Sequence, residues 1–166
     1  MAGFDYDTKE MLRGIEKIDT VVEVFSKGQT TAKTRSMENN IKKDVERKLR
    51  LASIKAGKIA TTPQQKMSVL SVVVTIQTFD TKLSIVDTLA LYRTEVKLER
   101  VAMITINKES FKIFPIVWNH NFVGYFGRIV DMNSVIRTRI KDQIDTLLND
   151  YLAVNPIKPT APKGGK

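Results

Sequence analysis

The chain has 166 residues, of which 42% are hydrophobic and 27% are charged, a composition that fits one globular domain and excludes a disordered chain. It has no cysteine, which excludes a disulfide scaffold, a cysteine-based metal site and thiol catalysis. Its 27 lysine and arginine residues against 18 aspartate and glutamate residues give a net charge of +9, which favours anionic partners such as nucleic acid or an anionic membrane surface.

A strand and then a helix are expected at the start of the domain. The β-branched run from Ile18 to Phe25 predicts the strand. For the helix, Ser36 is the expected N-cap and Gly57 the expected stop. Its apolar stripe recurs every three or four residues and comprises Met37, Ile41, Val45, Leu49 and Ala52. The candidate contacts for nucleic acid or another anion are Lys42, Lys43, Arg47 and Arg50. A solvated helix face would produce the same basic pattern.

Two long strands are predicted next. From Ser68 to Phe79 one face is apolar and the other is only half polar, so another element or a partner is expected to cover that second face. From Leu89 to Ala102 apolar side chains alternate with charged ones, as in an antiparallel strand that has one face in water.

A fourth strand and its lead into the last helix complete the predicted sheet. A turn at Asn107-Lys108 precedes the strand, which extends from Phe111 to Trp118. Because Pro115 cannot donate a backbone hydrogen bond, this strand is expected at an edge of the sheet or with a bulge. The residues expected to shape the turn into the last helix are Trp118, Gly124 and Gly127.

The last helix has the strongest periodic signal in the chain. Asn133 or Ser134 is its expected cap, and Asn155-Pro156 ends it. Its apolar stripe comprises Ile136, Ile140, Ile144, Leu147, Leu148, Tyr151 and Leu152. Residues 1–156 are therefore expected to form one domain, and residues 157–166, rich in proline, glycine and lysine, a flexible basic tail.

The order β-α-β-β-β-α predicts the α+β fold class. We expect a two-layer sandwich, in which a mainly antiparallel sheet of about four strands carries both helices on one face.

The sequence offers little material for catalysis. His120 is the single histidine, and it stands without a cysteine or a serine in a nucleophile motif. Ligand spacing for zinc or calcium and glycine-rich phosphate loops are also missing. We therefore expect no catalytic residue, metal, cofactor or small-molecule ligand, and a catalytic His120 is the least favoured hypothesis.

One part of the chain resembles a known group of proteins. Trp118 to Gly127 has the spacing Trp-x5-Gly-x2-Gly, and the helix after it ends in Asn-Asp-Tyr-Leu-Ala-Val-Asn-Pro. Together with the segment from Val45 to Arg50, these residues resemble exported bacterial proteins of similar size whose function is uncharacterised. The resemblance implies a single α+β domain in the periplasm or envelope, and it brings no activity or catalytic residues.

These observations lead to two functional hypotheses. The first is a non-enzymatic binding or assembly module of the bacterial cell envelope, whose partner is a protein or a second copy of the chain. The alternative is a basic nucleic-acid-binding protein that uses the first helix and the tail. The chain lacks a run of roughly 18 apolar residues that would span a membrane, and Met1 to Asp7 lack the apolar core of a signal peptide. The mature chain is thus expected in the periplasm or outside the cell, with the cytoplasm as the alternative.

Overall fold

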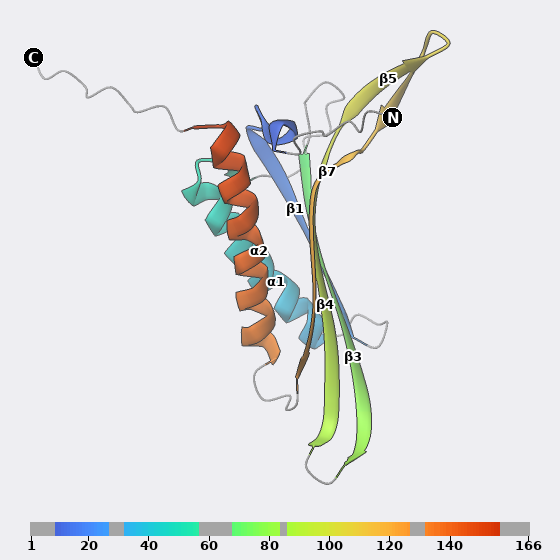
Figure 1. The fold of residues 1–166 in the computed structure, drawn as a ribbon, viewed down its shortest axis with the longest axis vertical. Coiled ribbons are helices and arrows are strands. Elements are labelled where there is room, and N and C mark those ends of the chain that lie inside the picture. Colours follow the sequence, from blue (N-terminus) through green and yellow to red (C-terminus); the bar gives the residue numbers. More distant parts are fainter. Residues whose placement is uncertain (1–8, 27–31, 57–67, 84–85, 127–131, 157–166) are drawn as a thin grey trace, which may run out of the picture.

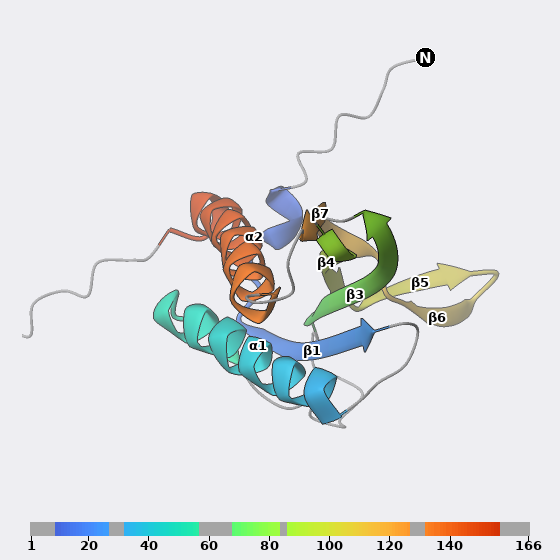
Figure 2. The ribbon, with the colours of Figure 1, turned by 90° about the horizontal axis from the view of Figure 1, so that it is seen from below.

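The computed structural model describes residues 9–26, 32–56, 68–83, 86–126 and 132–156. A five-stranded sheet forms one layer and two helices, both on the same face of the sheet, form the other (Figures 1 and 2). In chain order, the helices are the 3₁₀ helix η1 (Glu10–Leu12), α1 (Ala32–Leu51) and α2 (Met132–Val154). The sheet contains, from edge to edge, β2 (Lys55–Ala56), β1 (Lys17–Ser26), β3 (Ser68–Leu83), β4 (Val86–Arg100) and β7 (Ile116–Phe126).

The predicted α+β class is confirmed, but the number and order of the strands differ from the prediction. The sheet is mixed, because β1 runs parallel to both β2 and β3, whereas β3–β4 and β4–β7 are antiparallel. A strand that returns to the same sheet after a crossover helix lies parallel to its predecessor, and α1 is such a crossover. The additional strands are the two-residue β2 and the separate hairpin of β5 (Ala102–Ile106) and β6 (Glu109–Ile113).

The core lies between the helices and one face of the sheet. Along β3 the buried apolar side chains include Leu70, Val72, Val74 and Ile76, and along β4 they include Val96 and Leu98. The stripes predicted for both helices pack here. The α1 stripe is buried throughout its length, whereas in α2 the stripe is buried from Ile136 to Leu148, and Tyr151 and Leu152 are half-buried. Apolar burial on this scale is the main source of stability in a domain of this size.

Both helices begin earlier than the sequence suggests. Ser36 lies four residues inside α1, and Asn133 and Ser134 lie inside α2, so none of them is the cap. Polar residues are common at helix N-caps but also occur within helices, and the boundaries of a helix vary by one or two residues. α1 ends at Leu51, where Ser53 has a left-handed backbone (φ 61°) and the Ile54 amide bonds to a carbonyl of the last turn. Gly57, the predicted stop, lies outside the described residues.

Trp118 lies in a strand, as predicted, but the predicted turn at Gly124 is wrong, because β7 continues through this residue to Phe126. Gly124 is the register partner of Tyr92 on β4. A Cβ atom on Gly124 would come within 2.4 Å of the Tyr92 ring, so packing across the strands accounts for the glycine at this position. Gly127, the third residue of the predicted turn, lies outside the described residues.

The predicted strand from Phe111 to Trp118 is divided in two. Pro115 lies between β6 and β7, and its carbonyl accepts the Arg100 amide at 3.1 Å. The β4–β7 register shifts between Leu98 and Glu99, so the bulge expected near the proline is present, and β7 is an edge strand. The turn at Asn107-Lys108 is confirmed, with φ of 51° and 69°.

Candidate binding surfaces

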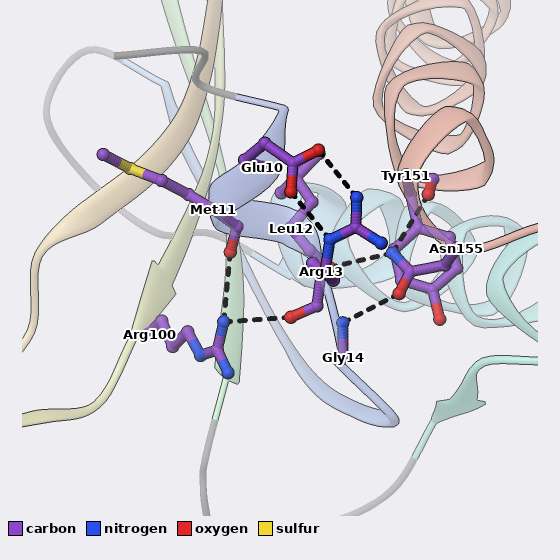
Figure 3. Close-up of polar contacts among 8 residues, drawn as sticks. All are labelled: Glu10, Met11, Leu12, Arg13, Gly14, Arg100, Tyr151 and Asn155. Carbon is purple, nitrogen blue, oxygen red and sulfur yellow. Dashed lines mark hydrogen bonds and ion pairs between the residues drawn. The ribbon is translucent and has the colours of Figure 1, made fainter.

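The end of α2 holds the N-terminal segment in place (Figure 3). The Asn155 side chain accepts a hydrogen bond from the Gly14 amide at 2.7 Å and donates one to the Leu12 carbonyl at 2.9 Å. The Tyr151 hydroxyl donates to the Ile15 carbonyl at 2.8 Å, and burial, together with the charge of nearby Glu16, raises the pKa of Tyr151. Tyr151 and Asn155 of the Asn-Asp-Tyr-Leu-Ala-Val-Asn-Pro pattern thus have a structural role.

From the opposite side of the same segment, Arg100 contributes a second attachment. Its guanidinium donates to the Met11 and Arg13 carbonyls, each at 3.2 Å (Figure 3). Gly14 has a left-handed backbone (φ 72°), which glycine adopts without strain, and this turn directs the chain from η1 toward β1. Arg100, the last residue of β4, thus connects the start of the β5–β6 hairpin to the N-terminal segment.

Trp118 and His120 connect β7 to α2. The Trp118 indole nitrogen donates to Asp150 at 3.0 Å. The Trp118 and His120 rings are stacked, with their centroids 6.0 Å apart. The buried amide of Gln143 lies 3.0 Å from His120 Nδ1 and donates to the His120 carbonyl at 3.1 Å. His120 lies in a strand rather than in a loop, and these contacts give it a positioning role between strand and helix.

Grooves lie along the outer edges of β1 and β7. The groove beside β1, of about 480 Å³, is lined by residues that include Asp19 and Glu38, and the groove beside β7, of about 450 Å³, by residues that include Trp118 and Asp150. Side chains from the helices bond to the strands here. Glu38 accepts a hydrogen bond from the Val24 amide of β1 at 2.9 Å, and Gln143 donates one to the His120 carbonyl of β7. An added strand would have to displace these side chains, so the edges are partly protected.

The structure brings three of the four predicted basic contacts together. Lys43, Arg47 and Arg50 are exposed along α1, and Arg50 lies 3.9 Å from Glu46. Lys42 is half-buried and lines the β1 groove instead. We call the three exposed residues the α1 basic strip.

Ion pairs join the two helices. Asp44 accepts two hydrogen bonds from Arg137, at 2.8 and 2.9 Å, and lies 3.4 Å from Lys141. Burial raises the pKa of Asp44, but the hydrogen bonds and charges of Arg137 and Lys141 outweigh burial and hold the pKa below its ordinary value. Lys48 and Asp145 form a further contact between the helices. These pairs stabilise helix packing, and they engage the charges of Asp44, Arg137 and Lys141.

The sheet face opposite the helices, which we call the helix-free face, has no described element packed over it (Figure 2). Side chains alternate along a strand, so residues next to the buried ones point to this face. Charged side chains lie at its centre, where Arg93 and Lys97 are 3.4 and 4.0 Å from Glu95. The predicted need for a cover on the half-polar side of β3 is thus not met within the described chain.

Exposed apolar side chains gather on this side of the molecule. Among the described residues, every exposed large hydrophobic side chain except Leu51 and Val135 lies on the helix-free face or on the β5–β6 hairpin and its base. On the face they are Val21, Leu91, Ile116, Val123 and Tyr125, and on the hairpin and its base they are Met103, Ile104, Ile106, Phe111 and Phe114. The exposed apolar side chains of the described residues are thus concentrated on one side of the molecule.

Leu91, Val123 and Tyr125 form one continuous cluster, which we call the β4–β7 patch. Leu91 and Tyr125 are register partners, and Val123 is paired with the next outward residue of β4, Arg93. Their exposed fractions are 37%, 65% and 76%. Sequence reasoning missed this patch because it ended the strand at Trp118 and read Gly124 as a turn residue, and because the residues from Asn119 to Tyr125 do not alternate between apolar and polar as in a typical strand.

In the described chain, no group of three or more histidine, cysteine, aspartate or glutamate residues could hold a metal ion. No described helix is long and apolar enough to cross a membrane.

No protein-family model and no curated protein matches the chain. Among solved structures, a homologue of the neuraminyllactose-binding hemagglutinin from Helicobacter pylori is similar, with a TM-score of 0.43, 8% identity and coverage of 83% of each chain. Rare lipoprotein B from Shewanella oneidensis is similar with a TM-score of 0.33 and 12% identity over 81% of this chain and 95% of that one. At these TM-scores neither structure carries an argument about function.

Proposed function

We propose that the chain is a non-enzymatic binding or assembly module of the bacterial cell envelope, and that it binds a protein partner or a second copy of itself through the β4–β7 patch. The observation that carries the proposal is the gathering of exposed apolar side chains on the side away from the helices. The envelope location rests on the resemblance of residues 118–127 and of the end of α2 to exported bacterial proteins. The contacts of His120 with Gln143 and Trp118 support a non-enzymatic role.

The composition of the helix-free face suits a protein interface. An aromatic and two aliphatic side chains at the β4–β7 patch lose water on binding. Each Å² of apolar area that is buried contributes about 25 cal/mol of favourable free energy. Beside them, Arg93, Glu95 and Lys97 form a polar border that gives orientation and specificity. The face is available as it stands, whereas binding at either sheet edge first requires Glu38 or Gln143 to move.

Light scattering over a series of protein concentrations tests the self-assembly form of the proposal. We expect the apparent mass of the wild type to rise with concentration and the double variant Val123→Ser, Tyr125→Ser to remain monomeric. The matched control is Leu51→Ser, since Leu51 is 79% exposed but lies on the helix side. This control should associate like the wild type.

Two results would overturn self-assembly through this surface. One is a wild type that stays strictly monomeric at high concentration. The other is association that the double variant leaves unchanged, because the contact would then lie elsewhere on the molecule.

The alternative is nucleic-acid binding through the first helix, where the α1 basic strip is exposed, and through the tail of residues 157–166, which lies outside the described residues. Lys43, Arg47 and Arg50 recur at helical spacing on one exposed side, where they follow a phosphate backbone more readily than scattered charges do. Fluorescence anisotropy with single-stranded and duplex DNA at about 50 mM salt tests this alternative. Binding should weaken as salt is added, because each phosphate that the protein neutralises releases counterions. The triple variant to alanine should weaken binding, and Lys55→Ala, an exposed lysine on β2, should not. Absence of binding to either DNA removes the alternative.

A further inference from the structure

The β5–β6 hairpin is a two-stranded sheet separate from the main one. Its register pairs Ile104 with Phe111 and Met103 with Lys112. Both views show it projecting beyond the main sheet, on the side away from the helices (Figures 1 and 2). A hairpin without a third strand or a covering helix is marginally stable in water, so a hairpin of this kind gains from a partner that covers it.

Apolar side chains are exposed on both faces of the hairpin. Ile104, Ile106 and Phe111 share one face, with exposed fractions of 36%, 53% and 45%. On the other face Met103 is 63% exposed, and Phe114 at the base is 47% exposed. The rest of this second face is polar, with the side chains of Thr105, Ser110 and Lys112. An element with one apolar face and one polar, basic face suits the boundary of an anionic lipid bilayer, where its apolar side meets acyl chains and its lysine side meets headgroups.

The charges of the hairpin are those of an element that meets anionic groups. Lys108 lies at the tip and Lys112 along one strand, and Glu109 is the single acidic residue of the two strands and their turn. Lys108 has a left-handed backbone (φ 69°), a conformation that glycine adopts more easily, so a lysine stands at the tip at a cost in backbone energy. The Lys112 ammonium lies 5.6 Å from the Phe114 ring centre, which places its charge beside an exposed aromatic side chain.

We propose that the β5–β6 hairpin binds the surface of an anionic lipid bilayer. The apolar side chains around Ile106 and Phe111 enter the boundary between headgroups and acyl chains, and Lys108 and Lys112 contact the anionic headgroups. Insertion stops at this boundary, because both outer strand edges carry unpaired backbone groups that hydrocarbon cannot satisfy. The net charge of +9 adds a long-range attraction to the same surface.

Co-flotation with vesicles tests the inference. Wild-type protein is mixed with vesicles of phosphatidylcholine alone or of phosphatidylcholine with phosphatidylglycerol. We expect binding to the anionic vesicles that clearly exceeds binding to the zwitterionic ones and that weakens with added salt. No binding to the anionic vesicles, or equal binding to both kinds, would overturn the proposal.

Variants show whether the hairpin is the contact. The double variant Ile106→Ser, Phe111→Ser should weaken partition to anionic vesicles about tenfold or more, while Leu51→Ser should bind like the wild type. Lys108→Gly should weaken partition about fivefold, the loss expected for one lysine at an anionic surface. It should also slow amide exchange in residues 102–113, because it relieves the strained turn. Unchanged partition for the double variant or for Lys108→Gly would contradict the assigned contact.

This inference goes beyond the proposed assembly function, and the two fail separately. The β4–β7 patch is distinct from the hairpin, so the Val123→Ser, Tyr125→Ser variant should bind vesicles like the wild type. The hairpin variants should in turn retain the self-association of the wild type. All of these variants replace exposed side chains, and unfolding in urea verifies that each one is folded.

Discussion

Gly124 is the residue at which a single methyl group has the clearest expected effect. Gly124→Ala should lower the free energy of unfolding by about 1–3 kcal/mol, because the new Cβ overlaps the buried Tyr92 ring. Urea unfolding measures the loss. In a Tyr92→Leu background the same change should cost less, since the ring is gone. Equal losses in the two backgrounds would show that Tyr92 is not the reason for the glycine. Val123→Ala, at the exposed neighbouring position, is the control.

Asp44 should give the protein a characteristic acid sensitivity. Its pKa is lowered in the folded state, so its stabilising contribution is fully present above the ordinary aspartate pKa of about 4 and is lost as the pH falls through the lower folded value. Asp44→Asn should reduce stability by about 1–3 kcal/mol at neutral pH and should flatten the acid part of the profile. Urea unfolding at a series of pH values measures both effects.

The control for this prediction is Asp142→Asn. The Asp142 side chain is 59% exposed and lies 3.9 Å from Arg139, and the change should therefore cost no more than about 0.5 kcal/mol. If Asp44→Asn costs as little as this control, the ion pairs between the helices do not stabilise their packing.

At the scale of the element, the end of α2 is fixed to the N-terminal segment by Tyr151. Tyr151→Phe removes the hydrogen bond to the Ile15 carbonyl and should cost about 0.5–1.5 kcal/mol. Because the folded pKa of Tyr151 is raised, its contribution is fully present below about pH 10 and is lost as the pH rises through the folded value. The melting temperature should therefore fall less steeply with rising alkaline pH in Tyr151→Phe than in the wild type. The same slope in both proteins would contradict this assignment.

The helices were the elements that could best be predicted from the sequence, because an apolar side chain at every third or fourth position is typical of an amphipathic helix. The stripe of α1 from Met37 to Leu49 and that of α2 from Ile136 to Leu148 are both buried. Their first residues could not be predicted, since the expected caps lie within the helices. β2 escaped prediction because two residues give no pattern, and its pairing depends on β1, far away in the sequence.

The last strand was misread for a specific reason. Glycine is read as a turn residue, and Gly124 lies in a strand because the Tyr92 ring requires the space. Pro115 was informative, since a break in the ladder and an edge strand both occur beside it. Among the candidate site residues, helical spacing brought Lys43, Arg47 and Arg50 together. The exposed apolar side chains were not predicted, because alternation shows that a strand has two faces but not which one remains uncovered.

At the scale of the whole molecule, the two sides of the sheet differ in kind. The helices cover one side, and their ion pairs and apolar stripes provide the stability. The other side displays the β4–β7 patch and the β5–β6 hairpin, whose exposed side chains contribute little to folding. Replacing such residues should therefore change binding far more than stability.

Amide hydrogen exchange at low and at high protein concentration tests this division most directly. If the helix-free face is the assembly surface, peptides that contain residues 90–93 and 122–125 should exchange more slowly at high concentration. Peptides from α1 and α2 should exchange at the same rate at both concentrations. Slower exchange confined to the helices, or no change anywhere in the chain, would contradict the assignment of the helix-free face as the self-assembly surface.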